Sequence, residues 1–207
     1  MQTMIKLYDF PLSGHAHKVR LMLSLLKIDY ERIEVALAKG EQRSEDFLAL
    51  NPFHHVPVLK EDGLVIRDSN AILTYLAKKF APDWYPSDAE SSARIQEWLS
   101  VANKELTEGP GTARLVNVFG AGLDHKAAIE KSHELLNIIE QHLEGRDWIA
   151  LEHVTVADIA LFTYIAHAPE GDVSLEAYPN INAWLAKIES LDGFVGMPKT
   201  NVGLTIS

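Results

Sequence analysis

The sequence predicts a small α/β domain followed by an all-helical domain. Three observations carry this prediction. Strand-like and helix-like segments alternate over residues 1–80, a polar stretch with two prolines follows, and every later apolar pattern has helical spacing. We therefore expect domains at 1–80 and 89–207, joined by a linker at 81–88.

The first domain is predicted to follow the order β-α-β-α-β-β-α. In the first helix, Val19, Met22, Leu23 and Leu26 fall at i, i+3, i+4 and i+7, which is one apolar stripe. Two helical crossovers and then a hairpin indicate a mixed sheet. The expected elements are strands at 4–8, 30–35, 57–60 and 64–67, and helices from 14 to about 27, at 44–50 and at 69–80.

The second domain is predicted to consist of four helices. The first is expected to kink or break at residues 109–111, which read Gly-Pro-Gly. The third is short and strongly apolar, which indicates a buried central helix, and Thr155 with Asp158 forms a capping box at its start. The expected spans are 89–118, 124–143, 155–166 and 180–191.

Composition restricts the classes of function. The 207 residues are 47% hydrophobic and 23% charged, as in ordinary soluble proteins, and no apolar run reaches the ~18 residues of a membrane span. With no signal-peptide layout at the start, we expect a cytoplasmic protein. The net charge of −10 argues against nucleic acid or an anionic membrane as partner.

Redox and metal chemistry by the protein itself are not expected. There is no cysteine, so disulfides, cysteine-ligated zinc and a protein thiol are excluded. The nine histidines show no ligand spacing with a nearby carboxylate on a helix, so we predict no metal site.

Two short motifs suit a ligand that resembles an amino acid. Pro57 stands where a strand begins, which leaves the peptide groups of Val56 outside the ladder. Asp68 and Ser69 place a carboxylate, a hydroxyl and free backbone N–H groups at one helix start. Both motifs also have a purely structural interpretation, as a trans proline at a loop–strand junction and as an N-cap.

Together these motifs resemble the glutathione S-transferases, and among them the bacterial serine-type or theta-like members. The resemblance covers nearly the whole chain and rests on four motifs at residues 13–20, 51–59, 68–73 and 155–158. It implies a thioredoxin-like N-terminal domain (βαβαββα) and glutathione as co-substrate, with no permanently bound cofactor. It also implies a homodimer, and a site for a small hydrophobic electrophile in the helical domain.

The resemblance assigns the two motifs to glutathione. Pro57 is expected to be cis, with the backbone N–H and C=O of Val56 offered to the cysteinyl part. Asp68 would pair with the γ-glutamyl ammonium, while the Ser69 hydroxyl and the N–H groups at the helix start would bind its carboxylate. Many relatives carry Glu or Gln where Asp68 stands.

The glycine end of glutathione is expected near residues 54 and 55. His55 lies where relatives place a side chain on the glycine carboxylate, and His54 replaces a common glycine. Lys39 and Arg43 could add positive charge for the same carboxylate. A solvated loop side chain is the alternative for Lys39, Arg43 and His55.

Ser13 is the candidate catalytic residue. A free thiol with a pKa of about 8.5 is only a few per cent ionised at neutral pH, and a hydroxyl donor at a helix start favours the thiolate. The alternative is that Ser13 only caps the helix. His15 could also face the sulfur, whereas Tyr8 lies one residue before the position of the tyrosine-type classes.

Three further residues are candidates with open alternatives. Arg114 and Tyr164 could line the cavity for the second substrate or could serve in helix packing. Phe53 could insert into a partner subunit or could be an ordinary loop aromatic.

We therefore predict a glutathione transferase that conjugates glutathione to small hydrophobic electrophiles, with peroxidase activity compatible with the same residues. One alternative is a non-catalytic binding protein of this fold, similar to the stringent starvation proteins, although the glutathione motifs here are intact. The other is a glutathione-dependent isomerase, whose Ser-Ser-Cys-Ser type of motif is replaced by residues 13–16, Ser-Gly-His-Ala.

Overall fold

The computed structural model describes residues 4–206 of the chain. Its N-terminal domain contains a four-stranded mixed sheet in the order β2-β1-β3-β4, with β1 and β2 parallel and the other two pairs antiparallel. The elements are β1 Ile5–Asp9, α1 Gly14–Leu25, β2 Tyr30–Glu34, α2 Glu45–Leu50, β3 Val58–Glu61, β4 Leu64–Arg67 and α3 Ser69–Phe80. The predicted order βαβαββα is confirmed.

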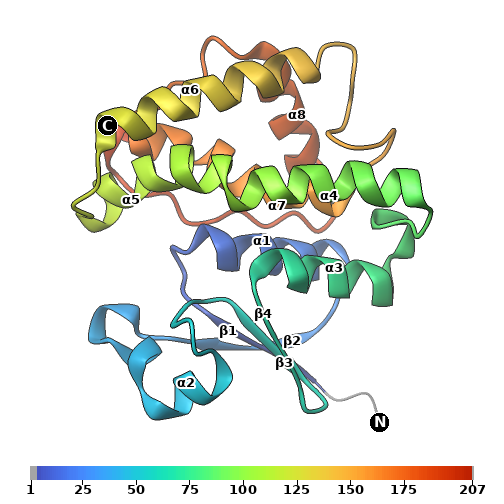
Figure 1. The fold of residues 1–207 in the computed structure, drawn as a ribbon, viewed down its shortest axis with the longest axis vertical. Coiled ribbons are helices and arrows are strands. Elements are labelled where there is room, and N and C mark those ends of the chain that lie inside the picture. The colour runs from blue at the N-terminus through green and yellow to red at the C-terminus, as the bar shows by residue number, and fades with distance from the viewer. Residues whose placement is uncertain (1–3, 207) are drawn as a thin grey trace.

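The two faces of the sheet have different coverings (Figure 1). Helices α1 and α3 lie between the sheet and the helical domain, and α2 lies on the opposite side. Strand β1 shows the alternation that this requires: Leu7 is fully buried in the main core, while Tyr8 meets Phe47 of α2 with ring centroids 6.4 Å apart. Tyr8 is therefore a packing residue of the second, smaller core.

The C-terminal domain is helical. It consists of α4 Ala89–Asn103, α5 Thr112–Phe119, α6 His125–His142, α7 Val156–Ala166 and α8 Pro179–Glu189. The expected helix at 89–118 is interrupted, as predicted, by a π-helical stretch at Thr107–Gly111 that contains Pro110. Gly109 permits a close approach there, because a Cβ at this position would lie 3.0 Å from the backbone nitrogen of Ser132 in α6.

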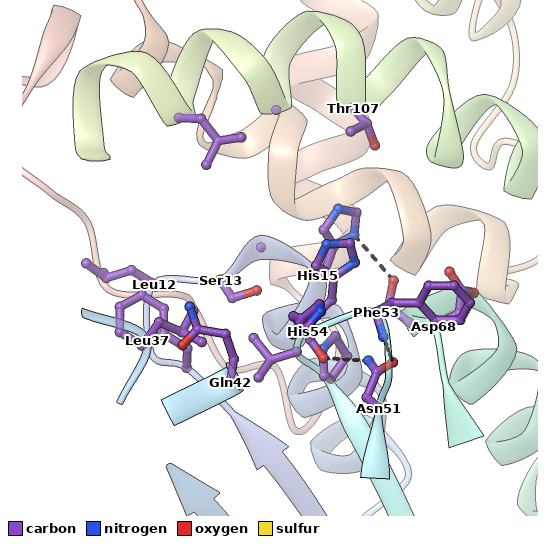
Figure 2. Close-up of a pocket in the computed structure, with 18 of the residues that line it drawn as sticks. Leu12, Ser13, His15, Leu37, Gln42, Asn51, Phe53, His54, Asp68 and Thr107 are labelled. Carbon is purple, nitrogen blue, oxygen red and sulfur yellow. Dashed lines mark hydrogen bonds between the residues drawn. The ribbon is translucent and has the colours of Figure 1, made fainter. Parts of the chain in front are cut away.

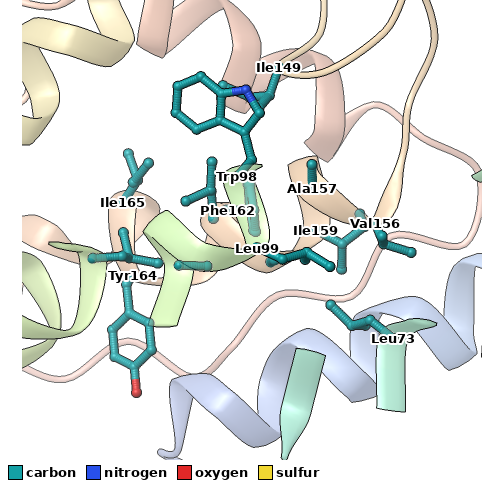
Figure 3. Packing of buried hydrophobic residues seen from close by; sticks show 14 of the residues in the cluster. Leu73, Trp98, Leu99, Ile149, Val156, Ala157, Ile159, Phe162, Tyr164 and Ile165 are labelled. Atoms are coloured by element: carbon teal, nitrogen blue, oxygen red, sulfur yellow. The ribbon is translucent and has the colours of Figure 1, made fainter. Parts of the chain in front are cut away.

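Helix α7 forms the centre of the domain. Every residue from Val156 to Ile165 is buried, and Leu73, Trp98 and Leu99 from other helices surround this helix (Figure 3). The predicted capping box is present: Ala157 N donates to the Thr155 hydroxyl at 3.2 Å, and Asp158 accepts from Thr155 N at 2.8 Å.

The boundaries differ little from the prediction, and α1 ends at Leu25 rather than near residue 27. The linker contains a short 3₁₀ helix, Pro82–Trp84. One continuous core extends from the sheet through α8, so the domain boundaries at 80 and 89 stay a prediction. Within residues 4–206, no helix combines the length and apolar character that spanning a membrane requires.

Candidate functional site

A cavity of about 900 Å³ lies between the two domains. Its lining brings together segments that are far apart in the sequence (Figure 2). Nine of the predicted site residues contribute to it: Ser13, His15, His55, Val56, Pro57, Asp68, Ser69, Arg114 and Tyr164.

The loop before β3 forms one wall of the cavity. The Val56–Pro57 peptide bond is cis, as the resemblance implied, and Val56 precedes the first residue of the strand. Buried Asn51 braces the loop, because its amide nitrogen donates to His55 O at 2.7 Å and its amide oxygen accepts from Phe53 N at 3.0 Å (Figure 2). His54 has φ 59°, a left-handed conformation that glycine adopts more readily than other residues.

Asp68 and Ser69 form a second wall at the start of α3. Asp68 is exposed and is the N-cap, accepting from Ala71 N at 2.9 Å through Oδ1. Ser69 is buried, and its hydroxyl lies 3.3 Å from Nδ1 of His15 (Figure 2). A carboxylate and a hydroxyl therefore lie at the helix start, where the backbone N–H groups favour an anion.

Ser13 lies at the start of α1 and is its N-cap. Its Oγ accepts from Ala16 N at 3.2 Å, and its own backbone N–H donates to Phe10 O at 3.0 Å. In the cap the oxygen accepts, so the hydroxyl hydrogen stays available to a second partner. Capping and donation to a sulfur in the cavity are thus compatible for Ser13.

His15 is an uncharged residue of this site. Burial, followed by the positive charges of Lys18 and His55, lowers the pKa of His15 to about 3. Its ring lies edge-on to Tyr164, with centroids 5.0 Å apart. At neutral pH the uncharged His15 ring can form a hydrogen bond with the Ser69 hydroxyl, but it supplies no positive charge to a bound anion.

The loop after β2 contributes different residues from those predicted. Lys39 and Arg43 are exposed and do not belong to the lining, which contains Leu37, Ala38 and Gln42 instead. Within residues 4–206, the Oε1 atom of Gln42 is buried and has no hydrogen-bond partner. Lys39 and Arg43 were predicted because of their positive charge, whereas the 3₁₀ helix Glu41–Arg43 directs the side chain of Gln42 toward the cavity (Figure 2).

Arg114 and Tyr164 reach the cavity from the helical domain. Arg114 is only 2% exposed; its Nε donates to Glu170 and its Nη1 donates to Leu12 O at 2.9 Å. Burial raises the pKa of Tyr164 to about 12, so the phenol stays protonated. Its ring covers Gly14, where a Cβ would lie only 2.7 Å from Cζ.

Lys18 was not predicted as a site residue, and its side chain is fully buried next to the start of α3. Its ammonium donates to Asn70 Oδ1 at 3.0 Å, and Asn70 Nδ2 donates to Leu99 O and Asn103 Oδ1. Burial lowers the pKa of Lys18 to about 8 despite the opposing charge of Asp68. The sequence shows a basic residue here but gives no signal of its burial.

In the part of the chain that the structure describes, no group of His, Asp or Glu residues could hold a metal ion. The helical-domain wall of the cavity combines the polar side chains of Asn103, Thr107 and Arg114 with Leu115, Phe119 and Tyr164.

Comparison with known proteins identifies the family. The family model of the glutathione S-transferase N-terminal domain matches residues 3–78, and that of the C-terminal domain matches residues 123–192. The chain belongs to the glutathione S-transferase family. A curated glutathione S-transferase 1 of Manduca sexta is 33% identical over 192 residues, which are 90% of this chain and 88% of that protein.

Solved structures of glutathione S-transferases have the same fold. The enzyme from Pseudomonas fluorescens has a TM-score of 0.89 and 30% identity, covering 95% of this chain and 100% of that one. A glutathione transferase homologue from Drosophila mojavensis, described with bound glutathione, has a TM-score of 0.84 and 26% identity, covering 91% and 89%.

Proposed function

We propose that this chain binds glutathione in the interdomain cavity and activates its thiol for attack on a small hydrophobic electrophile. One observation carries the proposal: Ser13, the cis Val56–Pro57 bond and Asp68-Ser69 come from three separate segments and line one cavity. Chain folding alone does not require a serine, a free peptide group and an exposed carboxylate to meet.

Glutathione would lie along the N-terminal wall of the cavity. The backbone of Val56 would pair with the cysteinyl residue, and Asp68 with the γ-glutamyl ammonium. The hydroxyl of Ser69 and the N–H groups at the α3 start would bind the γ-glutamyl carboxylate. His55 is exposed at the cavity edge, where it could donate to the glycine carboxylate, and the bound glutathione of the Drosophila mojavensis homologue supports this class of ligand.

Ser13 would stabilise the thiolate. Its hydroxyl hydrogen would point at the sulfur while its oxygen caps α1, and the N-terminus of α1 would favour the negative charge. The proton of the thiol leaves to solvent, the sulfur lone pair forms a C–S bond, and the leaving group departs with the electron pair of the bond that breaks. Reduction of an organic hydroperoxide by the same thiolate is compatible with this geometry.

The electrophile would bind against the helical domain, next to Arg114 and Tyr164. We also propose a cytoplasmic homodimer without a permanently bound cofactor. Phe53, which is 68% exposed at the cavity edge, supports a subunit contact. The non-catalytic alternative would not require the intact set of Ser13, Val56 and Asp68.

The test is a titration of glutathione into wild type and Ser13→Ala, with ultraviolet thiolate absorbance followed against pH. The variant should still bind glutathione, but its bound thiol should ionise at higher pH. Ser44→Ala is a matched control, because Ser44 caps α2 in the same way, accepting from Phe47 N at 3.3 Å, and does not line the cavity. Absence of glutathione binding in the wild type would refute the proposal, and an unchanged thiol pKa in Ser13→Ala would reassign the thiol donor to His15 or the backbone.

A further inference from the structure

The loop that carries Ser13 is held by two buried arginines from different domains. The loop comprises residues 10–13, named the Ser13 loop below. Arg20 of α1 donates to Phe10 O at 3.3 Å and to Pro11 O at 2.9 Å. Arg114 of α5 donates to Leu12 O at 2.9 Å. Three consecutive carbonyl groups immediately before Ser13 therefore accept from guanidinium groups.

Each arginine is fixed by a buried carboxylate. Asp9, at the end of β1, pairs with Arg20, and Glu170 pairs with Arg114. Asp9 and Glu170 are at most 1% exposed. An ion pair so deeply buried gains little net stability, because removing both charges from water offsets their attraction. Net stabilisation therefore does not account for the two ion pairs, Arg20–Asp9 and Arg114–Glu170, that lie next to the Ser13 loop.

Glu170 is in turn fixed from several sides. Its Oε1 accepts from Thr200 N at 2.7 Å and lies 3.1 Å from Nδ1 of His167. Burial alone would raise the pKa of Glu170, but the hydrogen bonds from His167 and Thr200 and the charge of Arg114 outweigh it and lower the pKa to about 2. Gly171 brings the backbone against α5, since a Cβ there would lie 2.6 Å from Arg114 N.

The guanidinium has the geometry for this role. Its planar donors can contact Glu170 through Nε and Leu12 through Nη1 at once, which a lysine ammonium on a flexible stem does not reproduce. Among the described residues, its Nη2 has no hydrogen-bond partner, although it is buried. An unpaired buried donor lowers stability, so stabilisation of the fold does not account for this donor.

We propose that Arg114, fixed by Glu170, is a positioning residue through which the helical domain sets the place of the Ser13 hydroxyl. This inference rests on the proposed function, because it assigns Ser13 to the glutathione sulfur. The Arg114–Glu170 pair has no net charge, so it would act on the glutathione thiol through the geometry of the Ser13 loop. A displacement of 1 Å at a reacting group can lower the rate about 100-fold.

The test uses the double variant Arg114→Met/Glu170→Gln. Replacing both charges avoids a buried unpaired ion, so the protein should fold. Arg114→Lys keeps the charge but loses the two-point contact. The matched control is Ser24→Ala, which removes a different bond between α1 and the C-terminal segment, Ser24 Oγ to Gly193 O at 2.6 Å.

Two readouts are needed. In the ligand-free protein, amide hydrogen exchange at Ser13 and Ala16 should become about tenfold faster in the double variant and in Arg114→Lys, but not in Ser24→Ala. In the glutathione complex without electrophile, the thiol pKa should rise in the same two variants. Glutathione affinity should change by less than about threefold, because Val56, Asp68 and Ser69 are untouched.

The outcomes separate this inference from the proposed function. An ordinary thiol pKa in the wild type would refute the role of Ser13, and with it the catalytic part of this inference, whatever the exchange rates. With a lowered thiol pKa in the wild type, unchanged exchange or an unchanged thiol pKa in the double variant would overturn the positioning role. Retention of the wild-type values by Arg114→Lys would also overturn it, since charge alone would then suffice.

Discussion

Asp158 offers a stability prediction whose size follows from counted hydrogen bonds. Its Oδ1 accepts from Ile149 N at 2.9 Å and from Trp184 Nε1 at 3.0 Å. Its Oδ2 accepts from Thr155 N at 2.8 Å and from the Thr155 hydroxyl at 3.1 Å. The carboxylate is fully buried, so it connects the start of α7, the preceding loop and α8 without help from solvent.

Asp158→Ala would leave three N–H donors without an acceptor, whereas the Thr155 hydroxyl can rotate to another one. Each orphaned buried donor costs about 1–3 kcal/mol, which gives roughly 3–9 kcal/mol for the three. Entry of water into the new space reduces this sum. We expect the free energy of unfolding to fall by about 4–6 kcal/mol, which is exceptional for a single substitution.

The measurement is urea unfolding followed by tryptophan fluorescence, with the transition midpoint compared at constant slope. Thr155→Ala is the matched control. It removes the cap but leaves the Asp158 carboxylate bound to Ile149 and Trp184, so its cost should be about 0.5–2 kcal/mol. If Asp158→Ala lost no more than Thr155→Ala, the buried carboxylate would not connect these three segments, and the reasoning would be wrong.

Two further predictions concern residues behind the site. Gly14→Ala should lower the free energy of unfolding by about 1–3 kcal/mol, because the new Cβ would lie 2.7 Å from Cζ of Tyr164. The double variant Gly14→Ala/Tyr164→Leu should lose less than the sum of the losses in the two single variants. Additive losses would contradict this clash. Burial lowers the pKa of Lys18 from 10.5 to about 8, so between these values the unfolded chain binds more protons and the free energy of unfolding should rise with pH. Lys18→Met should abolish this rise in urea unfolding at a series of pH values, and an unchanged slope would show that another group titrates.

Much of the fold follows from local sequence features. The element order is readable because most helix starts carry a capping side chain, as Ser13, Ser44 and Asp68 show. The π-helical interruption at Thr107–Gly111 contains Pro110, which has no N–H to donate. Such features act within one turn of a helix, so a single sequence displays them.

Part of the candidate site is equally local. The pairs Val56-Pro57 and Asp68-Ser69 each stand at the start of a strand or helix, where backbone groups are free, and this position indicates a binding role from the sequence alone. The cis state of Pro57 came from the resemblance rather than from the residues, because a trans bond is the more common state at any single X-Pro position.

Tertiary structure decided what surrounds these local features. It selected Gln42 rather than Lys39 or Arg43 for the cavity, because the orientation of a 3₁₀ turn determines which side chain faces inward. It also made His15 neutral and buried Lys18 completely, since burial depends on α3 and on the helical domain.

The contact between Arg114 and Leu12 joins residues 102 positions apart. Helix caps and hydrophobic periodicity involve neighbours along the chain, whereas this hydrogen bond exists only once the two domains have packed together. The sequence by itself determined the elements and the motifs that resemble those of the glutathione S-transferases. Packing between the domains decided how the Ser13 loop is held, because hydrogen bonds and burial depend on distance in space and not on separation along the chain.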